Sequence, residues 1–407
     1  MRQSDSAPQQ EPAGKRGQTG FRQANVKRVL DALRVGGPAS QAALARTTGL
    51  SPSTINAIVR SLRDQELIES RSLNGRESVV ALVARRGAVV ALHVGATELH
   101  AALFDFERER RVDRRRAVID DLSAAGPGMA AALVRELVAE SELELSQVDV
   151  VGVAMQAPIA RNAGTVASWA AAQLPGWRDA VIRDELSRSL EVEVVVDNDA
   201  NCAGLAEWTW GAGRGSDDFF YVLGSSHVGG AFILNGSVYR GGDGLAGEIG
   251  HMVVDPAGPI CVCGSRGCLT MYASEPAMLA ALTSSNGDMR SMTDIIAASR
   301  DGDLAARGVL YDVGRLLGRA LANVGKMMAP EVIVIGGELR TAGRPLFESL
   351  GSAVEVASLR AVSPTIEFRP AELTADVVLL GALVAGLEHR ETPLSELPDW
   401  TRRDLIA

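Results

Sequence analysis

The first ninety residues combine short helical patterns with polar turns. Apolar side chains fall at helical spacing in three segments, 25–35, 41–48 and 52–63. Ser40 is placed to cap the second segment, and Ser51 followed by Pro52 is placed to cap and start the third. Alternating segments then flank Asn74-Gly75, a pair typical of a tight hairpin turn. The pattern predicts three helices followed by a two-stranded ribbon, over residues 21–86.

The third predicted helix has one polar face. Its apolar stripe leaves small and polar side chains on the opposite side, near the helix N-terminus, where close approach and hydroxyl, amide and guanidinium donors suit base edges in a major groove. Two arginines flank the ribbon turn and are placed to contact backbone or minor groove. The candidate DNA contacts are Ser51, Ser53, Thr54, Asn56, Arg60, Arg71 and Arg76. The alternative is a small helical domain with a hairpin that contacts protein.

Charge divides the chain in the same place. The 407 residues carry a net charge of -9, but residues 1–90 hold 14 basic against 7 acidic side chains, whereas the rest holds 27 against 43. A basic head on an acidic body is typical of a phosphate-binding module attached to a small-molecule sensor. Neither a membrane-spanning run nor a signal peptide is present, so we expect a soluble cytoplasmic protein without a membrane partner.

The longer body has the pattern of an α/β fold. Buried strands are predicted at 89–106 (two strands around a tight turn), 148–155, 192–196 and 332–335, and long helices at 304–328 and 374–388. Asn198 and Asp199 follow one of these strands, at the edge where open α/β sheets bind ligands. An amide and a carboxylate can bond the vicinal hydroxyls of a sugar, although Asp-Asn-Asp is also common in turns.

Three of the four cysteines lie within eight residues. Cys261, Cys263 and Cys268 follow His251, and three thiolates with an imidazole are the ligands that tetrahedral Zn²⁺ takes. Because four protein ligands leave no open position, we expect one structural Zn²⁺ per chain.

The motifs together resemble the ROK family (repressor, open reading frame, kinase), in particular its xylose- and N-acetylglucosamine-repressor type. The winged helix pattern, the Asn-Asp pair, and Gly-Glu-Ile-Gly-His before the cysteine cluster carry this resemblance. It implies a winged helix-turn-helix plus an actin-like ATPase (sugar kinase) fold of two α/β lobes with a sugar in the cleft between them. The implied organisation is a tail at 1–20, a DNA-binding domain at 21–86, a sensor at 87–390 and a tail at 391–407.

The resemblance also implies site residues. Asn198, Asp199, Glu248 and His251 correspond to sugar contacts, and His251 would also ligate zinc. Thr270 stands where the family has a sugar-binding Glu.

The phosphate loops depart from those of the family's kinases. His93 replaces an Asp that serves Mg-nucleotide, Ala96 replaces a glycine, and Ser225-Ser226-His227 put side chains where phosphate needs bare backbone. We therefore expect no ATP and no catalysis.

The sequence thus favours a sugar-responsive DNA-binding regulator, a repressor of carbohydrate-use genes, with operator DNA, a small sugar and further copies of itself (dimer or tetramer) as partners. Two alternatives remain open. One is an active ATP-dependent sugar kinase with a DNA-binding head, favoured by retention of Asp199. The other is a DNA-binding regulator without a ligand, favoured by Thr270.

Overall fold

A computed structural model describes the chain in several stretches. They are residues 25–26, 28–30, 32–33, 36–64, 68–73, 77–82, 87–118, 126–282, 289–358, 366–373, 376–389 and 399–401. These residues form two units, one ending at Leu82 and one beginning at Gly87.

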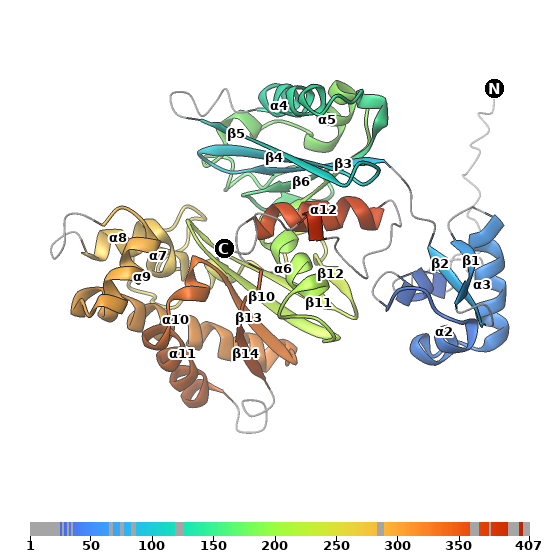
Figure 1. Ribbon diagram of the computed structural model, residues 1–407. Coiled ribbons are helices and arrows are strands. Elements are labelled where there is room, and N and C mark those ends of the chain that lie inside the picture. Colours follow the sequence, from blue (N-terminus) through green and yellow to red (C-terminus); the bar gives the residue numbers. More distant parts are fainter. Residues whose placement is uncertain are drawn as a thin grey trace, which may run out of the picture. The chain divides into compact units, whose positions relative to one another are not determined.

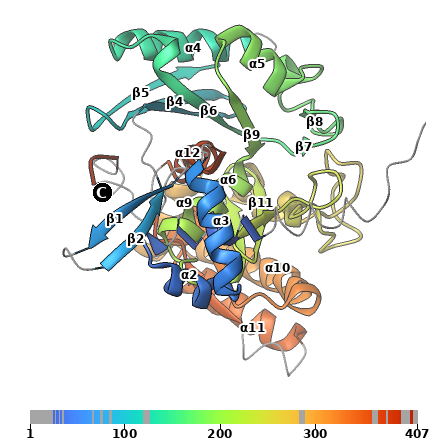
Figure 2. The same cartoon turned by 90° about the vertical axis from the view of Figure 1, so that its right-hand side faces the viewer.

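The first unit is a helical domain with a two-stranded ribbon (Figure 2). Helical residues between 25 and 36 are followed by α2 (Gln41–Thr48), α3 (Pro52–Asp64), β1 (Ile68–Leu73) and β2 (Glu77–Leu82). Both predicted caps form, since Ser40 Oγ accepts from Ala43 N at 3.2 Å and Ser51 Oγ accepts from Thr54 N at 3.2 Å. The core holds Val29, Leu30, Leu33, Leu44, Ile55, Ile58, Val59, Leu62, Ile68, Val80 and Leu82. Because β1 and β2 pair antiparallel beside three packed helical segments, the unit is a winged helix.

The second unit contains two five-stranded sheets (Figure 1). The first sheet has the order β5-β4-β3-β6-β9, from β3 (Ala88–Val94), β4 (Glu98–Asp105), β5 (Arg110–Ala117), β6 (Val148–Met155) and β9 (Val194–Asn198). The second has the order β12-β11-β10-β13-β14, from β10 (Asp218–Gly224), β11 (Val228–Leu234), β12 (Ser237–Tyr239), β13 (Val332–Gly337) and β14 (Glu367–Pro370). In each sheet three strands run parallel, and their carboxyl ends form the kind of edge at which open α/β sheets bind ligands.

Helices form three layers around these sheets (Figure 1). The outer layer of the first sheet is α4 (Pro127–Glu140) and α5 (Ile182–Leu190). The outer layer of the second is α7 (Thr270–Ala273), α8 (Glu275–Leu282), α9 (Met292–Asp301), α10 (Leu304–Met328) and α11 (Arg344–Ala357). Between the sheets lie α6 (Asp199–Trp210) and α12 (Val377–His389). The five layers are those of an actin-like fold with two α/β lobes.

Glycines let the central helices lie against each other. A Cβ on Gly381 of α12 would lie 1.8 Å from the carbonyl oxygen of Cys202 in α6, and one on Gly152 of β6 would lie 2.0 Å from the carbonyl oxygen of Ala382. Both positions therefore require a residue without a side chain. This close packing fixes the start of α6, where Asp199 stands, against the first sheet.

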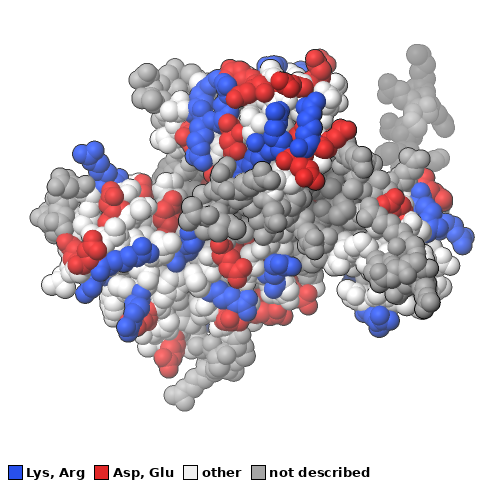
Figure 3. Space-filling view, in the orientation of Figure 1, with Lys and Arg blue, Asp and Glu red and all other residues white. Residues whose placement is uncertain are grey.

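The edge strand β5 is covered by charges of both signs. Arg114 pairs with Glu136 and Glu140 of α4 at 3.0 and 2.7 Å, and Arg115 pairs with Glu98 at 2.9 Å. Figure 3 shows basic and acidic side chains interspersed over this part of the second unit. Charged side chains on an edge strand hinder pairing with another sheet. No helix in the described stretches combines the length and the apolar character needed to cross a bilayer.

Two predicted segments differ from the structure. The last strand before the Asn-Asp pair begins at Val194 and includes Asp197 and Asn198, because its pairing with β6 continues to Met155. The predicted phosphate loop over 223–230 is a short turn, since Gly224 pairs with Val228 and both belong to strands. Only residues 225–227 lie outside the ladder.

Candidate functional site

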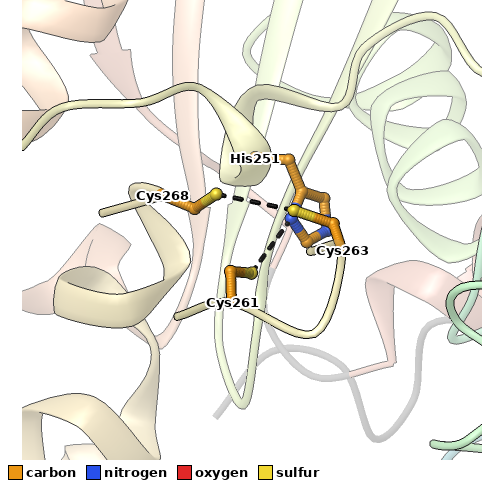
Figure 4. Close-up of side chains that lie close together, drawn as sticks. All are labelled: His251, Cys261, Cys263 and Cys268. Atoms are coloured by element: carbon orange, nitrogen blue, oxygen red, sulfur yellow. Dashed lines mark hydrogen bonds between the residues drawn. The ribbon is translucent and has the colours of Figure 1, made fainter. Parts of the chain in front are cut away.

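One cluster of side chains is arranged to hold a metal ion. The ligand atoms of His251, Cys261, Cys263 and Cys268 all lie within 4.8 Å of one another (Figure 4). His251 Nδ1 is 3.4 Å from Cys261 Sγ, and Cys263 Sγ is 3.6 Å from Cys268 Sγ. A tetrahedral ion with metal–sulfur bonds of about 2.3 Å has edges of roughly 3.5–3.8 Å, so the four atoms fit such an ion.

Backbone turns fold the cysteine-bearing segment, residues 261–268, around the four ligand atoms. Gly264 and Gly267 have φ of +88° and +60°, and a Cβ on Gly267 would lie 1.6 Å from the carbonyl oxygen of Asp255. Cys261 N donates to Ser265 O at 2.8 Å, which turns the chain back between the second and third cysteines. The two glycines are therefore required by the shape of the loop.

At Cys268, protonation of the thiol opposes metal binding. Burial, together with hydrogen bonds to Cys263 and Cys261, raises the pKa of Cys268 to about 12. A metal must displace this proton, because thiolate is the ligand form.

The segment before the cysteines lies directly on β11. A Cβ on Gly247 (φ +93°) would lie 2.3 Å from Gly230 O, and one on Gly250 would lie 2.0 Å from Val228 O. The close approach fixes Glu248 in a cavity wall that Gln156 and Asn198, at the carboxyl ends of β6 and β9, also line. Burial, and then the neighbouring Asp199 carboxylate, raise the pKa of Glu248 to about 7.

Glu248 and His251 face one cavity. Its wall is formed by Gln156, Ala157, Pro158, Trp169, Gln173, Asn198, His227, Val228, Gly229, Gly230, Glu248, His251, Val262 and Thr270. The His251 ring meets Trp169 edge-on, with 4.6 Å between centroids. With Nδ1 turned to the cysteines, His251 keeps Nε2 for another partner. Apolar surface with convergent donors and acceptors suits a small polar ligand.

The Asn-Asp pair is divided between two environments. Asn198 caps α6, since its Oδ1 accepts from Ala200 N at 2.9 Å and Asn201 N at 3.3 Å, yet it also lines the cavity. Asp199 is 1% exposed and does not belong to the cavity wall. Thus the structure brings Asn198, Glu248 and His251 to one cavity and places Asp199 behind it.

The group in front of Asp199 is His227, with Nε2 3.0 Å from Asp199 Oδ2. From the sequence, His227 was predicted only to obstruct phosphate, and its contact with Asp199 was not predicted. The sequence offered one indication of this contact, namely a histidine in the predicted turn and an aspartate after a strand of the other sheet.

The other departures from the kinase pattern lie beside it. His93 is on β3, its Nε2 is buried with no hydrogen-bond partner among the described residues, and burial lowers the pKa of its ring. Ala96 N donates to Gln156 Oε1 at 2.9 Å. Thr270 begins α7 and faces the cavity.

The predicted DNA contacts on α3 form one surface. Ser51, Ser53, Asn56 and Arg60 are exposed, and Thr54 is half-buried. Ser51 Oγ also lies 2.9 Å from Ser53 Oγ and 2.8 Å from Thr54 Oγ1, so the three hydroxyls are held together at the helix N-terminus. The side chain of Arg71 and all of Arg76 lie outside the described residues.

Comparisons with known proteins cover both units. Residues 89–387 match the sequence model of the ROK family, and residues 23–76 match that of the MarR family. The xylose repressor of Bacillus subtilis (strain 168) is 26% identical over 91% of this chain and 97% of its own length. A glucokinase of Halalkalibacterium halodurans is 33% identical over 58% of this chain and 76% of its own length.

A solved structure agrees with the fold. A ROK family transcriptional regulator, described as a homologue of the E. coli Mlc protein, superposes with a TM-score of 0.75 at 24% identity, over 92% of this chain and 98% of its own. The ROK match spans well over half of the chain. This chain therefore belongs to the ROK family.

Proposed function

We propose that the protein is a sugar-responsive DNA-binding transcriptional regulator that represses genes of carbohydrate use. One observation carries this proposal: the similarity to a xylose repressor runs through both units, over 97% of that repressor. The similarity to a glucokinase covers 58% of this chain. The proposed boundaries are a tail at 1–20, a DNA-binding domain at 21–86, a sensor at 87–390 and a C-terminal tail at 391–407.

The sugar is proposed to bind in the cavity beside the cysteine loop. Asn198, Glu248 and His251 supply the polar contacts, and Trp169 supplies an apolar face. Asp199 contributes from behind the wall. The absence of a Glu at Thr270 leaves one carboxylate fewer than the family pattern, so the preferred sugar is expected to differ from that of relatives that keep it.

Zinc is proposed as the ion at His251, Cys261, Cys263 and Cys268. Three sulfurs and one imidazole nitrogen fit its preference, and no position is left for water. Its contribution is to folding: it would fix the loop that carries His251 and would supply no chemistry to the ligand.

The DNA is proposed to lie against the N-terminal face of α3. Ser51, Ser53, Thr54, Asn56 and Arg60 would meet base edges or phosphates, and Arg71 and Arg76 the flanking backbone. A two-fold operator is best met by two heads, so we propose a homodimer or homotetramer, acting in the cytoplasm with the DNA. Sugar changes operator affinity only if it binds one arrangement of the heads better than the other.

The kinase-like unit is proposed to be non-catalytic. In a sugar kinase the buried Asp takes a proton from the attacking hydroxyl, and phosphoryl transfer depends on positioning and on charge neutralisation. Here the Asp199 carboxylate is paired with His227, and His93 replaces a hard oxygen ligand. A coupled ATP assay across sugars tests this; turnover abolished by Asp199→Asn would establish the kinase instead.

The decisive experiment is thermal unfolding of the zinc-loaded protein with xylose, glucose, N-acetylglucosamine and their phosphates, with and without Mg-ATP. A ligand at a hundred times its Kd stabilises the folded state by about 2.7 kcal/mol, a measurable shift of the midpoint. One sugar raising the midpoint and releasing operator DNA supports the sensor. Operator binding that no sugar changes favours the ligand-independent regulator.

A further inference from the structure

The turn between β10 and β11 reaches from the second sheet to the edge of the first. Ser226 and His227 belong to this turn, whereas Gln156 follows β6 and Asp199 follows β9. Gln156 Nε2 donates to Ser226 Oγ at 3.1 Å and lies 3.3 Å from His227 Nδ1. A chain of polar contacts therefore joins the two lobes across the cleft.

Both ends of this chain are fixed. Gln156 Oε1 accepts the backbone N–H of Ala96 in the β3–β4 turn at 2.9 Å. Asp199 Oδ1 accepts from Ala200 N at 2.8 Å and from Asn198 Nδ2 at 3.0 Å, which leaves Oδ2 for His227. An ionised carboxylate only accepts, so His227 Nε2 is the donor. Nδ1 then accepts from Gln156 or, in the charged ring, donates to the Ser226 hydroxyl 3.4 Å away.

Electrostatic attraction favours contact between His227 and Asp199. Burial by itself lowers the pKa of His227, but attraction and hydrogen bonding to Asp199 outweigh it, so the pKa is raised. The pKa of Asp199 is lowered, since His227 outweighs the opposite effect of burial. An unpaired carboxylate at this depth would be costly, because a buried charge needs a partner.

The two partners differ in access to the cavity. The side chain of His227 is 27% exposed and belongs to the wall, beside Asn198 and Glu248, whereas the side chain of Asp199 is 2% exposed and does not. A ligand in the cavity can contact the imidazole of His227 directly, whereas the carboxylate of Asp199 can affect the ligand only by orienting and polarising that ring.

We propose that His227 is an effector-contacting residue of this protein, that Asp199 is the positioning residue behind it, and that the pair, with Gln156, holds the two lobes together around the ligand. The proposal rests on the proposed function in one respect, that the ligand is a sugar. It assigns Asp199 a role through His227 in place of direct contact with a hydroxyl.

A double-mutant cycle tests the pair. Kd is measured by calorimetry, with the sugar of the thermal panel that raises the midpoint most, for His227→Ala, Asp199→Asn and the double variant. Each single change should weaken binding at least about tenfold, and the double variant should be no weaker than the worse single by more than about threefold. Losses that multiply, or an unchanged Kd in His227→Ala, would overturn the proposal.

Two further variants separate positioning from general damage. The side-chain amide of His227→Gln can donate to Asp199 Oδ2, so this variant should recover most of the affinity that His227→Ala loses. His389→Ala removes another histidine–carboxylate contact, with Glu193 at 2.6 Å, outside the cavity wall, and should bind sugar as the parent does. A glutamine variant as weak as the alanine variant counts against positioning.

Hydrogen exchange without sugar tests the contact between lobes independently of the ligand. His227→Ala should speed exchange of the Ala96 and 225–230 amides at least about tenfold, because opening of the cleft exposes both turns. His389→Ala should not. If exchange is faster in His227→Ala but no sugar raises the unfolding midpoint, the contact between the lobes is supported and the proposal that the ligand is a sugar is refuted. If His227→Ala exchanges as the parent does and still binds sugar, the proposed role of the His227–Asp199 pair is refuted, whereas the proposal of a sugar sensor stands.

Discussion

Alanine in place of Gly247 tests how closely the Glu248 segment must lie on β11. The added Cβ would stand 2.3 Å from Gly230 O, whereas ordinary van der Waals contact begins at 3.4 Å. The segment must therefore move by about 1 Å, since backbone on both sides cannot rotate away as a side chain does. At φ +93° an alanine is also strained by roughly 1–3 kcal/mol.

The displacement acts on the next residue, Glu248. A hydrogen bond to a charged group is worth about 1.5–3 kcal/mol, so Gly247→Ala should weaken sugar binding about tenfold to a hundredfold. Operator binding in the absence of sugar should be retained, because α3 belongs to the other unit. Calorimetry with the sugar, and fluorescence anisotropy with labelled operator DNA, measure the two effects separately.

Gly242→Ala is the matched control. It lies five residues away, has no other atom within 4 Å of the added Cβ and needs no positive φ, so it should behave as the parent does. If Gly247→Ala binds sugar as tightly as Gly242→Ala while remaining folded, the close packing of this segment does not determine the site and the reasoning fails.

Three other changes test the remaining parts of the site. Cys263→Ser should lower bound zinc well below one per chain and lower the unfolding midpoint, because a closed metal site contributes folding free energy; unchanged metal content by atomic absorption contradicts the assignment. Arg60→Ala should weaken operator binding and reduce the salt slope by about one if Arg60 meets a phosphate, or relax sequence preference at one base if it meets a guanine. Glu248, with its pKa raised to about 7, is neutral below that pH, so sugar affinity should rise between pH 6 and 8 if the carboxylate accepts from hydroxyls. The stability of the sugar-free protein should move the other way: the neutral carboxyl stabilises fully below its unfolded pKa near 4.5, and this is lost as pH rises through 7. Glu248→Gln should flatten both profiles, and profiles unchanged in that variant would contradict the shift.

Local patterns predicted the elements well. The strand at Val148–Met155 and the helices at Gln41–Thr48 and Leu304–Met328 have the bounds that periodicity gave. Apolar spacing determines which face is buried, and N-caps such as Ser40 determine the residue at which a helix begins. The cysteine cluster was equally accessible, because its three thiols are neighbours in sequence and only His251 had to be brought from ten residues away.

What sequence patterns missed were contacts between distant residues. Asp199 was predicted as a sugar contact, which stays a prediction, but nothing in Asp-Asn-Asp indicates that a histidine 28 residues later lies 3.0 Å from its carboxylate. The second cluster of this kind, His100 with Asp113 at 3.1 Å and Asp376 at 3.4 Å, had no sequence signal either. Both depend on strand order: the first contact joins the end of β9 to the β10–β11 turn, and the second joins β4, β5 and the residue before α12.

A motif fixes the position of a side chain along a strand or helix, but its neighbours determine what that side chain can do. The scaffold keeps Asp199 at the start of α6 because Asn198 caps this helix and Gly381 lets α12 pack against it. Those constraints hold for a kinase and for a sensor alike, so retention of the motif does not distinguish them. Under the proposed function the difference lies in the turn at 225–227, whose three residues lie outside the β10–β11 ladder. An imidazole there gives Asp199 a hydrogen-bond donor, which lowers the pKa of its carboxyl and makes it a weaker base toward a hydroxyl. Change of function on this fold is therefore expected to begin in such turns and to leave the helix starts and strand ends as they were.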